Sequence, residues 1–343
     1  MQPHKLSDQF SPVKTDLLQD ASEYRLAIQG WHMDCQQISA GRFKSKLTQI
    51  SLGHVQVIRV RTNRAMMNRG VCWPGSIVFS LLLAASGPSR ACGHEIFPSA
   101  DLIACETELP ELLTPDEFDL MTLAIDKEWF ATKASKYGCQ LIAELTWKGM
   151  LRIPEIQYEN LQISLRTLLA MTSERPQLLA YPEAREQIED DLLARLLEAL
   201  RTAPQITVLR DTPRKKTADL ACELALSDPS QRLDIARICR VLHVSRRYLQ
   251  NCFQDSYGQS ATQLLRVIRL HRVRQESKAN VLLGRHISIG DVAARSGFWH
   301  RSTFSREYQT HFGELPSATK CSSTRSDERL RPMAIGSRAV SAA

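Results

Sequence analysis

The sequence has no long apolar run. Its most hydrophobic stretch, residues 77–85, is far shorter than the roughly 20 apolar residues that a membrane-spanning helix needs. The polar N-terminal stretch, residues 1–16, lacks the apolar core of a secretory signal peptide. These absences argue against membrane and secreted proteins, and we expect a cytoplasmic protein with no membrane partner.

Cysteine and histidine are present but lack the spacing of metal sites. The nine cysteines are an odd number without a C-x-x-C pair, so neither a disulfide framework nor a zinc site is predicted. His32, His54 and His94 lie on separate segments, which argues against a metal-dependent enzyme. We therefore predict no catalytic residue, no metal site and no enzyme activity, and we place most cysteines in the core.

Positive charge is concentrated towards the C-terminus. The chain has 343 residues and a net charge of +7. From residue 205 onwards there are 23 Lys and Arg against 12 Asp and Glu, a net charge of +11, whereas residues 1–204 have 21 against 25, a net charge of −4. Basic domains bind nucleic acids through phosphate neutralisation, with an affinity that falls steeply with salt. This distribution predicts double-stranded DNA as the partner of the C-terminal part.

A first helix-turn-helix pattern occupies residues 233–253. Apolar residues recur at helical spacing on both sides of a turn at His243 and Val244. Ser245 is the expected N-cap of the second helix, because its hydroxyl can accept from a free backbone amide there. Arginine, glutamine and asparagine on the outer face suit the reading of base edges in the major groove. The predicted contacts are Arg246, Arg247, Gln250 and Asn251, with phosphate as an alternative partner for Arg246.

A second pattern of the same kind covers residues 287–317. Gly297 ends a support helix, and Phe304 and Tyr308 belong to the buried stripe of the helix that follows. A basic helix over about 261–278 joins the two units and would hold the recognition helices roughly 34 Å apart, about one turn of DNA. The predicted contacts of the second unit are Arg301, Ser302, Thr303, Ser305 and Arg306.

These two units, the RVIRLHRVR segment between them and the closing GF…F.R.Y…FG..PS pattern resemble the DNA-binding domain of the AraC family of bacterial transcription regulators. LHVSRRYLQN and GFWH are most similar to the family's regulators of ethanolamine utilisation, and LAIQGW, SAGRFKSKL, LGHVQVIR and VCWPGS extend the similarity to the N-terminal part. The resemblance implies a sequence-specific activator, a homodimer, RNA polymerase as a further partner, and a small-molecule effector such as ethanolamine or adenosylcobalamin.

Four positions depart from the family pattern. His243 stands where the family usually has glycine, Cys239 where it has alanine, and Ala261 where it has proline. His300 stands where a Ser or Asp cap is common. None of the four belongs to a predicted reading face, so they bear on turn geometry and stability more than on DNA binding.

The N-terminal part combines strands and helices. Short β-type runs are expected over 46–51, 55–61, 76–83, 102–105 and 120–125, with a hairpin turn at 52–54. Helical periodicity follows over 129–137, 156–171 and 183–200. The leucine stripe of the last helix suits either packing on the strands or pairing with a second subunit. A pocket lined by Trp31, Trp73 and Phe79 is an alternative to a plain core for these aromatic side chains.

The fold class predicted is α+β, with an N-terminal β-rich cupin-like barrel or sandwich, a helical dimerisation segment and a C-terminal all-α tandem helix-turn-helix domain. The expected domains are a flexible arm (1–23), an effector-binding and dimerisation domain (24–203), a linker (204–216), the DNA-binding domain (217–320) and a disordered tail (321–343). Two other functions stay open: a DNA-acting alkyl-acceptor enzyme that uses an N-terminal cysteine, and a non-specific nucleoid-type binder.

Overall fold

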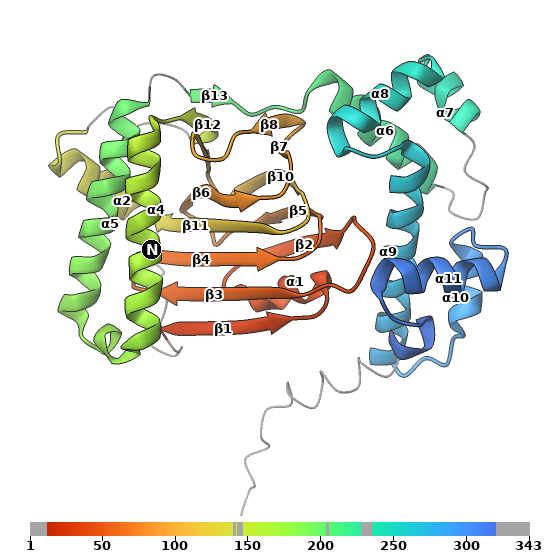
Figure 1. Cartoon of the computed structure of the whole chain (residues 1–343), viewed down its shortest axis with the longest axis horizontal. Coiled ribbons are helices and arrows are strands. Elements are labelled where there is room, and N and C mark those ends of the chain that lie inside the picture. The colour runs from red at the N-terminus through yellow and green to blue at the C-terminus, as the bar shows by residue number, and fades with distance from the viewer. Residues whose placement is uncertain (1–11, 140–141, 143–146, 204–205, 228–234, 320–343) are drawn as a thin grey trace, which may run out of the picture.

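The computed structural model describes residues 12–139, 142, 147–203, 206–227 and 235–319. An antiparallel β-structure and its covering helices form the N-terminal part, and a purely helical part follows (Figure 1). The expected α+β architecture is therefore confirmed. The tail predicted beyond residue 320 lies outside the described residues. None of the described helices is both long and apolar enough to cross a membrane.

The larger sheet has eight strands in the order β1-β3-β4-β11-β6-β9-β12-β13. Neighbouring strands run antiparallel, as β6 does to both β11 and β9. The strands are β1 (Val13–Leu18), β3 (Ser45–Ser51), β4 (Val55–Thr62), β6 (Ser76–Ala85), β9 (Asp101–Cys105), β11 (Phe118–Asp126), β12 (Lys148–Arg152) and β13 (Ile206–Val208).

The smaller sheet has five strands in the order β2-β5-β10-β7-β8. Together the two sheets enclose an apolar interior that includes Trp31, Leu47 and Ile58. The strands are β2 (His32–Gln37), β5 (Met66–Val71), β7 (Ser89–Ala91), β8 (His94–Ile96) and β10 (Glu108–Thr114). A short η1 (Ala21–Glu23) and α1 (Tyr24–Ala27) precede β2. We call the two sheets together the barrel.

The β3–β4 hairpin confirms the predicted strand and turn positions. The backbone amide of Leu52 donates to Val55 O at 2.9 Å across the turn. Side chains alternate between the two faces of the sheet. Val55 and Val57 lie in the cluster under the helices, whereas Ile58 lies in the barrel interior. Because the alternation is regular, the sequence specifies both the strand and its buried face.

Residues 13–23 do not form the flexible arm that was predicted. Val13–Leu18 is an edge strand that pairs with β3, and Leu18 is buried. The Asp20 carboxylate accepts from Ser22 N at 2.9 Å and caps η1. The prediction was wrong here because a polar edge strand needs only one buried face, which a short window cannot distinguish from a loop. Residues 1–11 lie outside the described residues.

Helices cover one face of the larger sheet (Figure 1). They are α2 (Lys127–Lys136), α4 (Glu155–Glu174) and α5 (Pro182–Thr202), with η2 (Pro176–Ala180) between the last two. The leucine stripe of α5, including Leu193, Leu196 and Leu197, is buried against this face. Of the two alternatives for that stripe, packing on the strands is therefore correct.

The helical part comprises α6 (Pro213–Ser227), α7 (Ile235–Val241), α8 (Arg246–Tyr257), α9 (Ala261–Leu282), α10 (Ile289–Arg295) and α11 (Arg301–Phe312). The predicted linker, 204–216, is not a free linker where it is described. Residues 206–208 form β13, which pairs with β12, and α6 already begins at Pro213. Lys215 was assigned to the linker, but its side chain is buried. Its ammonium group pairs there with Glu111 of β10 at 2.8 Å.

Candidate nucleic-acid interface

The first unit, α7 and α8, is held by an apolar seam. Ile238 of α7 packs in one cluster with Leu249 and Phe253 of α8. The Ser245 hydroxyl accepts from Tyr248 N at 3.1 Å and caps α8 as expected. His243 has a φ of 53°, a left-handed conformation that glycine adopts at much lower cost. The departure from the family pattern at His243 therefore places a non-glycine residue in a left-handed turn position.

The outer face of α8 carries the predicted contact residues. Arg246, Arg247, Gln250 and Asn251 are all exposed. Within the described part of the chain, neither Arg246 nor Arg247 has a carboxylate partner, so both guanidinium groups can bind an external acceptor. Tyr248, the next residue, is 38% exposed and was not singled out, because an aromatic residue at this spacing equally suits a core position.

The second unit, α10 and α11, is built differently. The Ser288 hydroxyl accepts from Asp291 N at 3.1 Å and caps α10, while Gly297 takes the left-handed position of the turn with a φ of 84°. His300 gives α11 no side-chain cap. The aromatic core contains Phe304, Tyr308 and Phe312.

The predicted contacts of the second unit differ in exposure. Arg301, Ser302 and Arg306 are exposed, whereas Thr303 and Ser305 are half-buried. Asp291 approaches Arg301 only at 3.9 Å, and both side chains are exposed. Trp299, just before α11, is 57% exposed and had no assigned role. The three exposed residues and Thr303 form the part of α11 that can meet a groove.

Helix α9 joins the units, and three of its arginines make contacts within the protein. Arg269 is buried and donates to Ala225 O of α6 at 3.2 Å. Arg266 pairs with Glu307 of α11 at 3.3 Å. Arg274 is buried against Phe312, with its guanidinium carbon 4.3 Å from the ring centroid. Much of the positive charge of α9 therefore fixes the two units rather than facing DNA.

The barrel contacts the first unit mainly through apolar side chains. Ile38, Met67 and Leu113 belong to the same buried cluster as α6, α8 and α9. Buried Lys215 of α6 adds ion pairs to Glu111 of the barrel and to Asp219 of α6. Lys216, the neighbouring exposed residue, lines a cleft of about 900 Å³ between the barrel and α6. The first unit thus shares one continuous core with the barrel.

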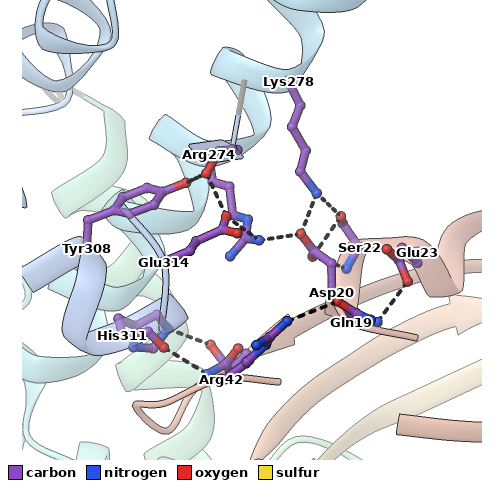
Figure 2. Close-up of polar contacts among 12 residues, drawn as sticks. Gln19, Asp20, Ser22, Glu23, Arg42, Arg274, Lys278, Tyr308, His311 and Glu314 are labelled. Atoms are coloured by element: carbon purple, nitrogen blue, oxygen red, sulfur yellow. Dashed lines mark hydrogen bonds and ion pairs between the residues drawn. The ribbon is translucent and has the colours of Figure 1, made fainter. Parts of the chain in front are cut away.

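Polar side chains join the barrel to the second unit (Figure 2). Arg274 pairs with Asp20 at 2.8 Å and with Glu314 at 2.9 Å, and Lys278 also pairs with Asp20. Burial would raise the pKa of Asp20, but Arg274 and Lys278 outweigh it and hold that pKa well below its ordinary range. Asp20 is therefore ionised in this contact.

Gln37 of β2 extends the same contact. Its amide donates to His311 O at 2.9 Å, and its backbone carbonyl accepts from His271 Nε2 at 2.6 Å and from His311 Nε2 at 3.2 Å. Burial lowers the pKa of His271 to about 3 and that of His311 to about 4. Both imidazoles are therefore neutral at pH 7. We call Asp20, Gln37 and their partners on α9 and α11 the polar latch.

The barrel interior holds a cavity of about 80 Å³. Trp31 lines it, as the pocket alternative proposed, and its indole N–H donates to Gln56 at 2.8 Å. Trp73 does not line it, and Phe79 packs with Phe130 and Trp147 under the helices instead. The described lining contains no charged side chain. No three His, Cys, Asp or Glu side chains in the described ranges could hold a metal ion together.

Comparisons with known proteins agree with this arrangement. Residues 238–321 match the family model of a helix-turn-helix domain, in agreement with the two units described above. The probable thc operon regulatory protein of Rhodococcus erythropolis is 32% identical over 131 residues, 38% of this chain and 35% of that protein. The XylDLEGF operon transcriptional activator 1 of Pseudomonas putida is 24% identical over 218 residues, 61% of this chain and 65% of that protein. The chain thus covers less than two thirds of either relative.

Among solved structures, the AraC-like transcriptional activator CuxR is 15% identical and covers 82% of this chain and 100% of its own, with a TM-score of 0.41. The unsaturated fatty acid-bound ToxT of Vibrio cholerae is 14% identical and covers 85% of this chain and 95% of its own, with a TM-score of 0.29.

Proposed function

We propose that the chain is a sequence-specific DNA-binding transcription regulator of the AraC type, and that it activates its target operons. The observation that carries the proposal is the pair of helix-turn-helix units, each with exposed polar side chains on its second helix. Exposed glutamine and asparagine beside arginine suit base reading, whereas binding to backbone alone needs only cations. Two relatives that are named as operon regulators or activators support the same function.

Each unit would read one major-groove segment. In the first, we assign base contacts to Arg247, Gln250 and Asn251, and phosphate to Arg246. A rigid α9 would make the two contacts a single bivalent event, with the segments roughly 34 Å apart. In the second unit, the assigned contacts are Arg301, Ser302, Thr303 and Arg306, with half-buried Ser305 at the edge.

Two adjacent arginines provide a matched test. A site selected from random DNA supplies the specific sequence, and its scrambled version is the reference. Arg247→Ala is expected to cost about 1–3 kcal/mol on the selected site and to relax the preference at one base position. Arg246→Ala should weaken the selected and the scrambled DNA alike and reduce the salt dependence. Equal losses on both DNAs for Arg247→Ala would contradict the base-reading assignment.

Control by a small molecule is the second part of the proposal. The interior cavity of about 80 Å³ is smaller than the roughly 150 Å³ apolar cavity that holds benzene, so it would take a ligand of only a few heavy atoms. Adenosylcobalamin far exceeds this size. Ethanolamine is small enough, but its ammonium group would meet no carboxylate in the described lining. We therefore favour a small apolar effector.

Titration calorimetry of the full-length protein with ethanolamine, adenosylcobalamin and xenon-saturated buffer tests this choice. Heat of binding with xenon alone is expected, because xenon is an apolar probe smaller than benzene. Saturable binding of ethanolamine or adenosylcobalamin instead would overturn the preference for an apolar effector without touching the DNA assignment.

A homodimer is the assembly we propose, with RNA polymerase as a further partner at promoters. The leucine stripe of α5 is already buried, so it cannot supply the subunit interface. The outer face of α4 can, because Ile156 and Ile163 are 59% and 60% exposed two turns apart. Light scattering of Ile163→Glu against Gln162→Glu checks this: only the first should yield a monomer.

An alkyl-acceptor enzyme is not favoured. Burial raises the pKa of the Cys72 thiol to about 12 and that of Cys92 to about 11, and it also raises the pKa of Cys35 and Cys105. A nucleophilic cysteine needs a lowered pKa and access to its substrate. None of these four thiols has a lowered pKa, and three of them, Cys35, Cys72 and Cys105, are also buried.

A further inference from the structure

The outer face of the larger sheet is only partly covered by helices. In β4, Val55 and Val57 lie beneath α4 and α5, and Arg59 and Arg61 continue the same row of side chains beyond the helices. Arg59 is partly exposed, and the Arg61 side chain is 61% exposed. The row therefore changes from apolar to basic where the helical cover ends.

A hollow of about 200 Å³ lies at this boundary, between β3, β4 and α4. Lys46 of β3 is directly opposite Arg61, and Thr48 is opposite Arg59. Like charges directly opposite each other destabilise a sheet, so an anion bound between Lys46 and Arg61 would relieve their repulsion. Arg166 of α4 adds a fourth cation at the rim. We call this space the basic hollow; its polar lining is Lys46, Thr48, Arg59, Arg61, Arg166 and Ser173.

The cations of the basic hollow outnumber the carboxylates beside it. Asp119 of β11 accepts from Arg59 at 2.6 Å and 2.9 Å, and it approaches Arg61 only at 3.7 Å. Within the described residues, Lys46 and Arg166 have no carboxylate partner. This excess of positive charge lies in the part of the chain whose net charge is −4. The basic hollow is therefore a local cluster of positive charge in a part of the chain whose net charge is negative.

A second hollow, of about 520 Å³, adjoins the first and shares Lys46 and Arg61 with it. Its lining is mostly polar and includes Arg42, Lys44 and the carboxylates Glu117 and Asp119, whereas Leu17 is its exposed large apolar side chain. The combined space thus has a cationic end at the basic hollow and an exposed leucine in the adjoining hollow. We propose that it binds a small phosphate ester, with the phosphate in the basic hollow and the organic group towards Leu17.

Phosphate matches the groups that are present. A guanidinium fork can bind two phosphate oxygens at once, and a lysine adds a compact charge. Arg61, Arg166 and Lys46 supply these groups, and the basic hollow has room for one phosphate with a few waters. The basic hollow shares no lining residue with the interior cavity, and none of its lining residues belongs to α8 or α11, the helices proposed to read DNA. If the phosphate site is not found, the proposed DNA-binding function is unaffected.

Titration calorimetry of the full-length protein at constant ionic strength tests the site. The probes are inorganic phosphate and phenyl phosphate, with chloride as the reference salt. Both phosphates are expected to bind, and phenyl phosphate more tightly. Arg166→Gln should weaken phosphate binding about tenfold, whereas Arg195→Gln, which removes an exposed cation of α5 outside the hollow, should change it less than twofold. Asp119→Asn should tighten binding, because it releases Arg59 and Arg61.

Three results would overturn the proposal. One is the absence of phosphate binding beyond that of chloride. Another is an equal loss for Arg166→Gln and Arg195→Gln, which would indicate general charge attraction. The third is unaltered phosphate binding in Arg166→Gln together with weaker binding to a selected DNA site, which would assign these cations to the DNA backbone. Thermal unfolding of each variant shows whether it is folded.

Discussion

The barrel holds the two helix-turn-helix units by different kinds of contact. The first unit shares an apolar core with Ile38, Met67 and Leu113 of the barrel. The core cluster of the second unit contains no described barrel residue, and the polar latch around Asp20 and Gln37 joins that unit to the barrel instead. Apolar burial is non-directional, whereas ion pairs and hydrogen bonds depend on geometry and protonation. We infer that the second unit is the one whose position can change at low cost.

The largest effect is expected at Arg274 in the polar latch. Replacing it by methionine leaves Glu314 and the buried Asp20 without their main cation. The free energy of unfolding should fall by about 3 kcal/mol, near the low end for a broken buried ion pair because Lys278 remains. Urea denaturation measures the change. Exposed Arg272→Met is the control, and its free energy of unfolding should stay within about 0.5 kcal/mol of the parent. If Arg274→Met loses no more unfolding free energy than Arg272→Met, the ion pairs of the latch add no stability.

Acid should weaken the latch before it affects the apolar contact. His271 and His311 have lowered pKa values in the closed state, about 3 and about 4, and regain ordinary values near 6.5 when exposed. Protonation therefore favours opening. Above pH 6.5 the stability of the contact does not depend on these histidines. Below pH 6.5 each histidine reduces that stability by about 1.4 kcal/mol per pH unit, until the pH reaches its lowered pKa. Asp20, with its lowered pKa, adds a loss only below its ordinary value of 3.8.

Urea midpoints of the parent between pH 7 and pH 5 measure this loss. His271→Gln combined with His311→Gln keeps neutral donors beside Gln37, so the dependence should flatten over that range. A parent midpoint that does not fall would refute the assignment. Arg274, Asp20 and Phe312 are the other groups that face these imidazoles.

The two units also differ in the conformation of their turns, with a smaller expected effect on the free energy of unfolding. His243 is left-handed in the first turn, whereas Gly297 occupies the left-handed position of the second. His243→Gly should raise the free energy of unfolding by about 1 kcal/mol, since glycine adopts this conformation without the steric cost. Thermal unfolding checks it, with His286→Gly, outside the helices, as the control. A lower melting temperature for His243→Gly would mean that the imidazole has a stabilising contact.

At the start of the second helix, the first unit has the more favourable residue. Ser245 caps α8, and His300 leaves α11 without a side-chain cap. His300→Ser should therefore stabilise the second unit by about 0.5–1 kcal/mol, while Ser245→Ala should destabilise the first by a similar amount. Hydrogen exchange at the first amides of each helix reports both changes. No added protection at Thr303 in His300→Ser would show that the serine does not form the cap.

Much of the fold follows from periodicity in the sequence. The alternation in 55–61 and the leucine stripe of 183–200 predicted β4 and α5, because each places its apolar residues on one face. The strand β1 was missed, since an edge strand with a single buried residue, Leu18, depends on the partner it pairs with. Buried Lys215 was missed for a similar reason, because its carboxylate partner Glu111 is about a hundred residues away in the sequence.

The candidate site was predictable where one helix determines it. The exposure of Arg247 and Gln250 follows from their spacing to Leu249 and Phe253. The polar latch was not predictable, because Gln37 meets His271 and His311 across more than 230 residues and no local pattern records the contact. Whether the exposed side chains read bases stays a prediction, since it depends on the DNA that they meet.

The most direct test of the tandem reader is binding of the purified protein to fragmented genomic DNA from its own source at near-physiological salt, followed by sequencing of the retained fragments. The account predicts enrichment of a few sites, each with two short motifs about one helical turn apart. Uniform retention of all fragments would contradict it, because the basic domain would then bind only the DNA backbone.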